Sequence, residues 1–262
     1  MKKSTYRCAA FIFTAISVLF INVNLFASEM DDRIETSAKQ SYVFKTYLKG
    51  DDIKIQSQDG VVTLSGTVSE DSHILLAGET LTGLPGVKSF NNQLVVKSGL
   101  PAMNSDTWLG TKVKFILLFY RSLSATEISV SAKDGAVTLR GKATSMAQKD
   151  LATEYTKDIE GVASVNNEMT LPPVADKAGS QTMGERMDAM GGSIDDASIT
   201  ALVKTTLLYH RSTSAVKTTV TTKDGVVTLA GKARNVAEKD LATKFVSDVH
   251  GVVKVVNNMM VE

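Results

Sequence analysis

One short phrase occurs three times along the chain and restricts the fold more than any other feature of the sequence. Residues 59–66 read Asp-Gly-Val-Val-Thr-Leu-Ser-Gly, and closely similar phrases occupy residues 134–141 and 224–231. A Gly-Val pair begins 26 residues after the first glycine of each phrase, and an asparagine follows six residues later. Repetition at a constant spacing is the signature of repeated structural units. We therefore expect three copies of one small unit, here called repeats 1, 2 and 3.

The repeats set the predicted domain organisation. Residues 105–172 align without a gap on residues 195–262, with 31 of 68 positions identical. Repeat 1 is more diverged. Its opening helix is expected to be shortened, and Lys49-Gly50-Asp51-Asp52 stands where the others have Arg-Ser-x-Ser-Ala. The predicted units are repeat 1 (31–98), a linker (99–105), repeat 2 (106–172), a second linker (173–193) and repeat 3 (194–262). The second linker is interpreted as flexible, with a docking helix as the alternative.

Each copy predicts the same order of elements. Helical spacing of apolar residues covers 106–120 and 196–210, and both stretches begin with an Asp able to cap a helix. A short strand, an Asp-Gly hairpin turn and a second strand follow, because both turn positions favour positive φ. Second helices are predicted at 69–84, 146–159 and 236–249, each followed by a glycine suited to a helix C-terminus. The residues assigned to turns, strand ends and caps are Asp59, Gly60, Gly66, Gly86, Asp134, Gly135, Gly141, Gly161, Asp224, Gly225, Gly231 and Gly251.

The predicted fold class is α+β, with each repeat running α-β-β-α-β. Its first two strands form an antiparallel hairpin. The third strand is reached through a helix and is therefore expected to lie parallel to the second, with a right-handed crossover. The result is a small mixed three-stranded sheet with two helices on one face.

This pattern resembles the BON domain. The resemblance rests on the helix, the Asp-Gly-Val-Val-Thr-Leu-x-Gly hairpin, the second helix and the closing Gly-Val-x-x-Val-x-Asn-x-hydrophobic segment. It covers nearly all of the chain after residue 30. The resemblance implies a non-enzymatic envelope protein, since the family includes osmotically inducible periplasmic proteins of Gram-negative bacteria. It also implies phospholipid, other envelope proteins or client proteins as partners.

The N-terminus predicts export to the periplasm. Three basic residues precede an apolar run that extends to residue 26, and polar residues follow, as in a secretory signal peptide. Cleavage is expected after Ala27, and an uncleaved membrane anchor is the alternative. Removal of residues 1–27 takes away the single cysteine and changes the net charge from +1 to −2.

Composition and motifs give no support for enzymatic chemistry. His73, His210 and His250 occupy three different positions of the repeat, and no two have metal-ligand spacing. They are interpreted as incidental polar or partly exposed residues. No phosphate-binding loop or nucleophile elbow occurs. We predict no catalytic residue, metal, cofactor, nucleic-acid partner or small-molecule substrate.

Trp108, the only tryptophan, is a candidate lipid-binding residue. With Leu109 and Lys112 it forms an aromatic and basic edge on the first helix of repeat 2, a combination suited to a membrane interface. The alternative is that Trp108 packs on the linker or on a neighbouring repeat.

A second candidate lipid-binding surface is basic. Lys142 in repeat 2 and Lys232 and Arg234 in repeat 3 precede second helices, whose N-termini attract anions. The alternative is a solvated face. Two functions remain: a soluble periplasmic stress protein with a chaperone-like protective role, and an adaptor that attaches to anionic phospholipid.

Overall fold

The computed structural model describes residues 21–97, 105–123, 127–171, 194–213 and 218–262, with side chains from residue 29 onward. Most of the predicted signal segment and of both predicted linkers therefore lies outside the described residues. Within the described ranges, no helix has the length and apolarity needed to cross a bilayer.

The described elements follow the predicted order in each repeat. Repeat 1 contains α2 (Ile21–Gln40), α3 (Tyr42–Thr46), β1 (Asp52–Gln58), β2 (Val61–Val68), α4 (Asp71–Thr82) and β3 (Ser89–Val96). Repeat 2 contains α5 (Asp106–Leu117), β4 (Ser129–Lys133), β5 (Ala136–Arg140), α6 (Met146–Asp158) and β6 (Ser164–Asn167). Repeat 3 contains α8 (Asp196–Tyr209), β7 (Thr218–Lys223), β8 (Val226–Ala233), α9 (Val236–Ser247), β9 (Lys254–Asn257) and the short β10 (Met260–Val261).

The predicted α+β fold with three small mixed sheets is confirmed. In each repeat the first two strands pair antiparallel and the third pairs parallel to the second. Alternate residues of the central strands, such as Val137 and Leu139 of β5, are fully buried beneath the helices. This alternation follows from the period of two in a strand that has one covered face.

The opening helix of repeat 1 differs from the prediction. It is interrupted at Ser41 and not shortened, because α3 continues the helical path after α2. The number of residues between the aspartate of the opening helix and the hairpin turn is also the same in all three repeats. Asp31, Asp106 and Asp196 each accept a hydrogen bond from the turn glycine 29 residues later.

The structure corrects the predicted roles of the aspartates at the helix starts and of two glycines in repeat 1. Ser105 and Asp195 cap α5 and α8, so Asp106 and Asp196 are free to reach the hairpin turns. Gly66 lies inside β2 and does not end it, with φ of 121° and the backbone oxygen of Asp52 only 1.9 Å from where a Cβ would lie. Likewise the C-cap of α4 is Gly83, and Gly86 lies in the turn beyond it.

Repeats 2 and 3 face each other through equivalent surfaces. The backbone N–H of Arg121 donates to Asp248 and that of Arg211 donates to Asp158, at 2.9 and 2.7 Å. The Arg121 guanidinium donates to the carbonyls of Ser247 and Val252, and the Arg211 guanidinium donates to those of Lys157 and Val162. Each arginine therefore satisfies one carbonyl at the end of the second helix of the other repeat and one in the turn that follows that helix.

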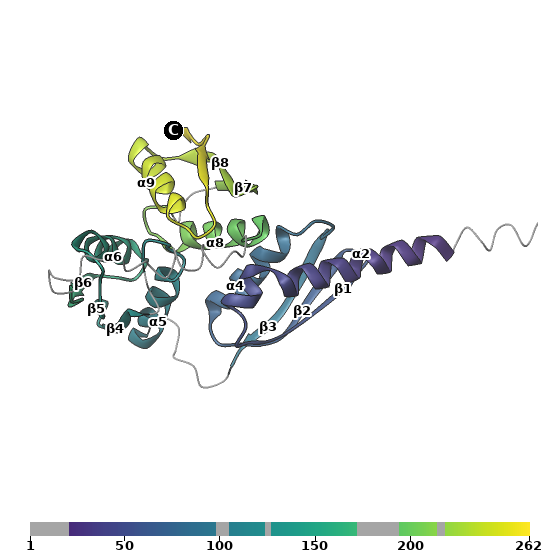
Figure 1. The fold of residues 1–262 in the computed structure, drawn as a ribbon, viewed down its shortest axis with the longest axis horizontal. Helices are drawn as coiled ribbons and strands as arrows, with labels where there is room; N and C mark the ends of the chain where they lie inside the picture. Colours follow the sequence, from purple (N-terminus) through teal and green to yellow (C-terminus); the bar gives the residue numbers. More distant parts are fainter. Residues whose placement is uncertain (1–20, 98–104, 124–126, 172–193, 214–217) are drawn as a thin grey trace, which may run out of the picture.

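Repeat 1 packs against both other repeats (Figure 1), with α4 against α8 and α3 against the N-terminus of α8. The backbone N–H groups of Tyr42 and Val43 donate to Asp195 and Ser198. The predicted alignment of Lys49-Gly50-Asp51-Asp52 with Arg-Ser-x-Ser-Ala is corrected: with the Asp-Gly turns superposed and no residue missing, Thr46-Tyr47 stands where repeat 2 has Arg121-Ser122. The Tyr47 ring instead packs edge-on against Phe115 and Phe119 of α5.

Candidate functional site

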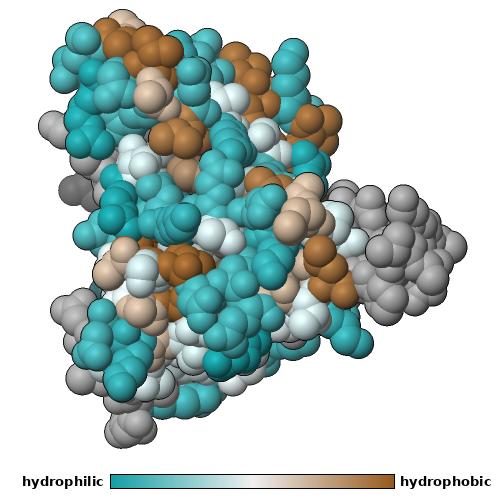
Figure 2. All heavy atoms as spheres, turned by 90° about the vertical axis from the view of Figure 1, so that its left-hand side faces the viewer, coloured by the Kyte–Doolittle hydropathy of each residue, from teal (hydrophilic) through white to brown (hydrophobic). Residues whose placement is uncertain are grey.

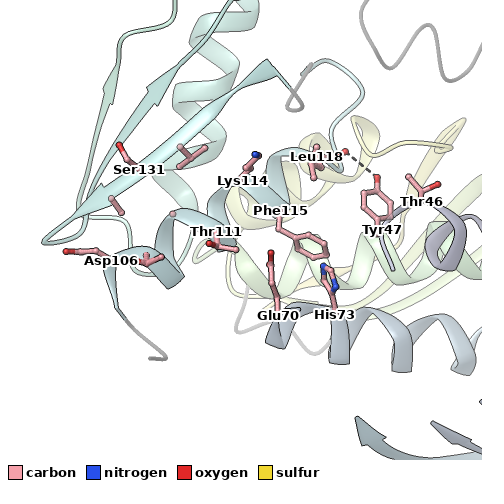
Figure 3. Close-up of a pocket in the computed structure, with 14 residues that line it drawn as sticks. Thr46, Tyr47, Glu70, His73, Asp106, Thr111, Lys114, Phe115, Leu118 and Ser131 are labelled. Carbon is pink, nitrogen blue, oxygen red and sulfur yellow. Dashed lines mark hydrogen bonds between the residues drawn. The ribbon is translucent and has the colours of Figure 1, made fainter. Parts of the chain in front are cut away.

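Two neighbouring cavities lie where the repeats meet. The larger, of about 590 Å³, separates repeats 1 and 2, and we call it the repeat 1–2 cavity (Figure 3). The smaller, of about 290 Å³, is lined by residues of all three repeats, and we call it the junction cavity. Glu70 and Thr111 line both cavities. The junction cavity therefore depends on the docking of the three repeats.

Aromatic and acidic side chains form much of the junction cavity. The indole N–H of Trp108 donates to Asp71 at 3.2 Å, which fixes the ring of repeat 2 against α4 of repeat 1. Tyr209 at the end of α8 supplies a second ring. Burial, followed by the charges of Asp71 and Glu70, raises the pKa of Tyr209 to about 12. Tyr209 therefore stays a neutral phenol at physiological pH.

Glu70 is the residue that links the two cavities. It occupies the N-cap position of α4, where repeats 2 and 3 have the capping residues Ser145 and Asn235. Its side chain makes no capping hydrogen bond and instead accepts one from the Ser72 hydroxyl at 3.2 Å. Burial raises the pKa of Glu70. The departure from Ser and Asn at this position was a sequence signal for the site, although it points to the residue and not to the cavity.

His73 closes one end of the repeat 1–2 cavity. Its Nδ1 lies 2.5 Å from Oδ2 of Asp51, and its ring lies tilted against that of Phe115. Figure 3 shows Glu70, His73 and Phe115 facing the same space. His73 is buried and fixed by a carboxylate, so the expectation of a partly exposed residue is wrong. His210 and His250 are buried as well.

The structure corrects most of the first candidate lipid-binding edge. Leu109 and Lys112 are each only 6% exposed. The Lys112 ammonium donates to the carbonyl of Glu160 at 2.8 Å and lies about 5 Å from the rings of Trp108 and Tyr209. Trp108 is half-buried against repeat 1. The alternative in which Trp108 packs on a neighbouring repeat is the observed arrangement.

The second candidate lipid-binding surface remains at the surface. Lys142, Lys232 and Arg234 are exposed. Lys232 forms an ion pair with Glu262, and Arg234 forms one with Glu238. Much of the charge of repeat 3 at this surface is therefore neutralised locally.

The described part of the chain offers no group of three or more His, Cys, Asp or Glu side chains arranged to hold a metal ion. A buried group of polar side chains outside the cavities involves His210, which lies between the Tyr120 hydroxyl and Asp158. Its ring is fully buried, so it has no access to a substrate.

Comparison with known protein families shows the family of this chain. The BON domain model matches residues 30–98, 105–173 and 195–262. The chain belongs to the BON domain family. Osmotically-inducible protein Y of Escherichia coli is 31% identical over 153 residues, which is 56% of this chain and 76% of that protein.

Two further BON relatives share shorter segments. The 21 kDa hemolysin of Actinobacillus pleuropneumoniae is 32% identical over 115 residues, or 43% of this chain and 59% of that protein. Outer membrane lipoprotein DolP of Haemophilus influenzae is 31% identical over 111 residues, or 42% of this chain and 57% of that protein. These matches relate the BON repeats, and they do not assign a ligand to the cavities between them.

Proposed function

We propose that the protein is a non-enzymatic periplasmic protein that protects other proteins during osmotic or envelope stress. The observation that carries this proposal is the 31% identity to Osmotically-inducible protein Y across 76% of that protein. His73, His210 and His250 are buried, and Trp108 packs between repeats. What the repeats leave outside is a mixed surface, which suits many weak contacts with client proteins.

The exposed apolar side chains support a protective role. On the face shown in Figure 2, hydrophobic side chains form several small groups separated by hydrophilic ones. Val95, Val253 and Met260 are 57%, 77% and 66% exposed and belong to repeats 1 and 3. Singly exposed apolar side chains are ordinary on protein surfaces and form no large aggregation-prone patch. In this proposal they supply the weak contacts to unfolded segments of a client.

Fractionation and an aggregation assay test the proposal. A C-terminally tagged chain is expected in the fluid released by osmotic shock, while a variant lacking residues 2–27 stays in the cytoplasm. The purified protein is expected to slow the aggregation of heat-unfolded citrate synthase, and Val253→Ser with Met260→Ser is expected to weaken this effect. Retention of the tagged chain in the cytoplasm would contradict the location, and unchanged aggregation kinetics would contradict the protective role.

Attachment to anionic phospholipid is the second candidate function, and one surface favours it. Lys142 pairs with Thr170 in a β-bridge, which brings it beside Leu171, and the first helical residue Met146 follows shortly after. Met146 and Leu171 are 59% and 43% exposed. In repeat 3, Lys232 pairs with the exposed Met260 in the same way. Basic and apolar side chains therefore lie together at equivalent ends of repeats 2 and 3.

Cosedimentation with vesicles separates the two functions. If the adaptor function holds, Lys142→Glu with Met146→Glu weakens binding to vesicles containing phosphatidylglycerol, because the charge and the apolar contact of repeat 2 are both lost. Trp108→Phe serves as the control, since the ring packs between repeats. Absence of binding by the wild-type protein removes the adaptor function and leaves the protective one.

A further inference from the structure

We propose that Asp134 is a site of spontaneous covalent modification, the isomerisation of aspartate to isoaspartate. The equivalent Asp59 and Asp224 are protected from this reaction by Asp31 and Asp196 of the opening helices. All three turn aspartates are exposed and precede a glycine, which has no side chain to hinder the reaction. The modification is separate from the protective function proposed above, since it concerns the chemistry of the hairpin turns.

The reaction needs only atoms of the turn and water. The backbone nitrogen of Gly135 attacks Cγ of the protonated Asp134 carboxyl group. A C–N bond forms, and the side-chain hydroxyl leaves as water with the amide proton. The cyclic succinimide then takes up one water. Attack at Cγ restores aspartate, whereas attack at the backbone carbonyl carbon breaks its bond to the Gly135 nitrogen and leaves the chain linked through Cγ, as isoaspartate.

Hydrogen bonds hold the attacking nitrogen more firmly in the other two turns. In repeat 3 the N–H groups of Asp224 and Gly225 donate to Asp196 at 2.8 and 2.9 Å. Repeat 1 has the same pair of hydrogen bonds, at 2.7 and 2.9 Å. In repeat 2 only Gly135 donates to Asp106, at 3.4 Å. A carboxylate that accepts from the amide opposes both loss of its proton and opening of the turn, so repeat 2 is the least protected.

The surroundings of the turn glycine are also the most open in repeat 2. Gly60 and Gly225 are buried, whereas Gly135 is half-buried. A Cβ placed on Gly60 or Gly225 would lie 2.7 or 2.8 Å from the nearest neighbouring atom, against 3.2 Å for Gly135. In repeat 1 the Lys88 ammonium also donates to the carbonyl of Asp59 at 2.9 Å. The turn of repeat 2 therefore has the most room to reach the geometry of attack.

The hairpin of repeat 2 is the shortest of the three. Five residue pairs join β4 and β5, whereas seven join β1 and β2 and six join β7 and β8. A shorter ladder opens locally at a lower cost in free energy. Hydrogen bonding, burial and ladder length therefore all identify Asp134 as the least protected of the three aspartates.

Mass spectrometry of peptides from the aged protein tests the proposal. The purified full chain is kept at neutral pH, and isoaspartate is measured at each turn at successive times. We expect isoaspartate to form at Asp134 at least about fivefold faster than at Asp59 or Asp224. In guanidinium chloride the three rates should become closely similar, because the local sequences are similar. Equal rates in the folded protein, or the same ranking in the unfolded chain, would overturn the proposal.

Asp196→Ala tests the protective contacts without altering a reacting residue. Because it frees the Gly225 N–H, isomerisation at Asp224 should rise at least about fivefold, while the rate at Asp59 stays unchanged. Asp196→Asn keeps an acceptor oxygen and should give an intermediate rate. The exposed Asp240→Ala in the same repeat is the matched control, and circular dichroism verifies folding. An unchanged rate at Asp224 in either folded Asp196 variant would contradict protection by the opening helix.

Discussion

The side chain of His210 is enclosed between repeats 2 and 3. Its Nε2 lies 2.5 Å from the Tyr120 hydroxyl, its Nδ1 lies 3.2 Å from Asp158, and its ring stacks on Phe245. Tyr155 occupies the position equivalent to Phe245 and donates its hydroxyl to Asp248. Each of the two equivalent aspartates thus receives one hydrogen bond from an aromatic side chain, but from different partners. Tyr120 and His210 occupy equivalent positions in repeats 2 and 3 and form a hydrogen bond with each other. This hydrogen bond depends on the two residues being different.

Replacing His210 by Phe is expected to destabilise the protein. The change keeps a ring against Phe245 but leaves the Tyr120 hydroxyl unpaired and removes the imidazole partner of Asp158. The expected loss is about 1–3 kcal/mol in the free energy of unfolding, measured by urea denaturation followed by circular dichroism. The exposed Lys142→Ala is the control and should stay within about 0.5 kcal/mol of wild type. If His210→Phe and the wild-type protein have the same free energy of unfolding, the polar contacts of His210 make no net contribution to stability.

The same residue predicts a dependence of stability on pH. Burial lowers the pKa of His210 below its ordinary value of 6.5, while Asp158 opposes this shift and Lys112 adds to it. Below about pH 6.5 the unfolded chain binds a proton that the native chain does not, so the free energy of unfolding falls as the pH decreases. Above pH 7.5 the imidazole is neutral in both states and contributes no slope. His210→Phe should therefore reduce the fall in stability between pH 7 and the lowered pKa, and parallel curves for the two proteins would contradict this.

At the scale of elements, an aspartate of the first helix fastens the hairpin in every repeat. Asp196 accepts from the backbone N–H groups of Asp224 and Gly225 at 2.8 and 2.9 Å. Asp106 accepts from Gly135 alone, at 3.4 Å. Asp31 accepts from Asp59, Gly60 and the Ser57 hydroxyl, and the Ser57 hydrogen bond is the main cause of its lowered pKa.

These contacts predict that the same Asp→Ala substitution lowers the free energy of unfolding by different amounts in repeats 2 and 3. Asp196→Ala leaves two backbone donors of the β7–β8 turn without their partner and should lower the free energy of unfolding by about 1–3 kcal/mol. Asp106→Ala removes a single long hydrogen bond and should cost clearly less. Urea denaturation of both variants gives the comparison. A larger loss for Asp106→Ala than for Asp196→Ala would contradict the assignment of these residues to the turns.

The order of elements was predictable because it depends on local patterns. The Asp-Gly turns, the alternating strands and the helical spacing of Leu151 and Tyr155 each act within a few residues. The role of Asp196 was not predictable, since it acts on a turn 29 residues away. The interruption at Ser41 was missed for a similar reason: α3 is oriented by Asp195 and Ser198, which lie more than 150 residues further along the chain.

At the scale of the molecule, docking between repeats decides which residues are available for function. The pairing of Trp108 with Asp71 and the contact of Lys112 with the Tyr209 ring cannot be read from repeat 2, because Asp71 belongs to repeat 1 and Tyr209 to repeat 3. The repeated Arg-Ser pair was visible in the sequence, but its target was not. Glu70 was also visible only as an unusual residue at a helix start. The cavity that it faces exists only in the assembled chain.

The two arginines at the interface of repeats 2 and 3 give the last prediction. Arg121 and Arg211 each reach one carbonyl at the end of the second helix in the opposite repeat and one in the turn that follows it, at distances of 2.6–3.2 Å for the closest contacts. Hydrogen bonds from a charged donor are stronger than those between neutral groups, so each Arg→Ala change should cost about 2 kcal/mol. Because both act on one interface, Arg121→Ala with Arg211→Ala should uncouple the repeats.

Calorimetry measures this uncoupling. The wild-type protein should unfold in one transition that includes repeats 2 and 3, and the double variant should show separate transitions at lower temperature, since small units are individually marginal. Arg140→Ala is the matched control, because Arg140 forms an ion pair with Glu168 on the surface and such pairs contribute at most about 1 kcal/mol. A single unshifted transition in the double variant would mean that the reciprocal arginine contacts do not hold the repeats together.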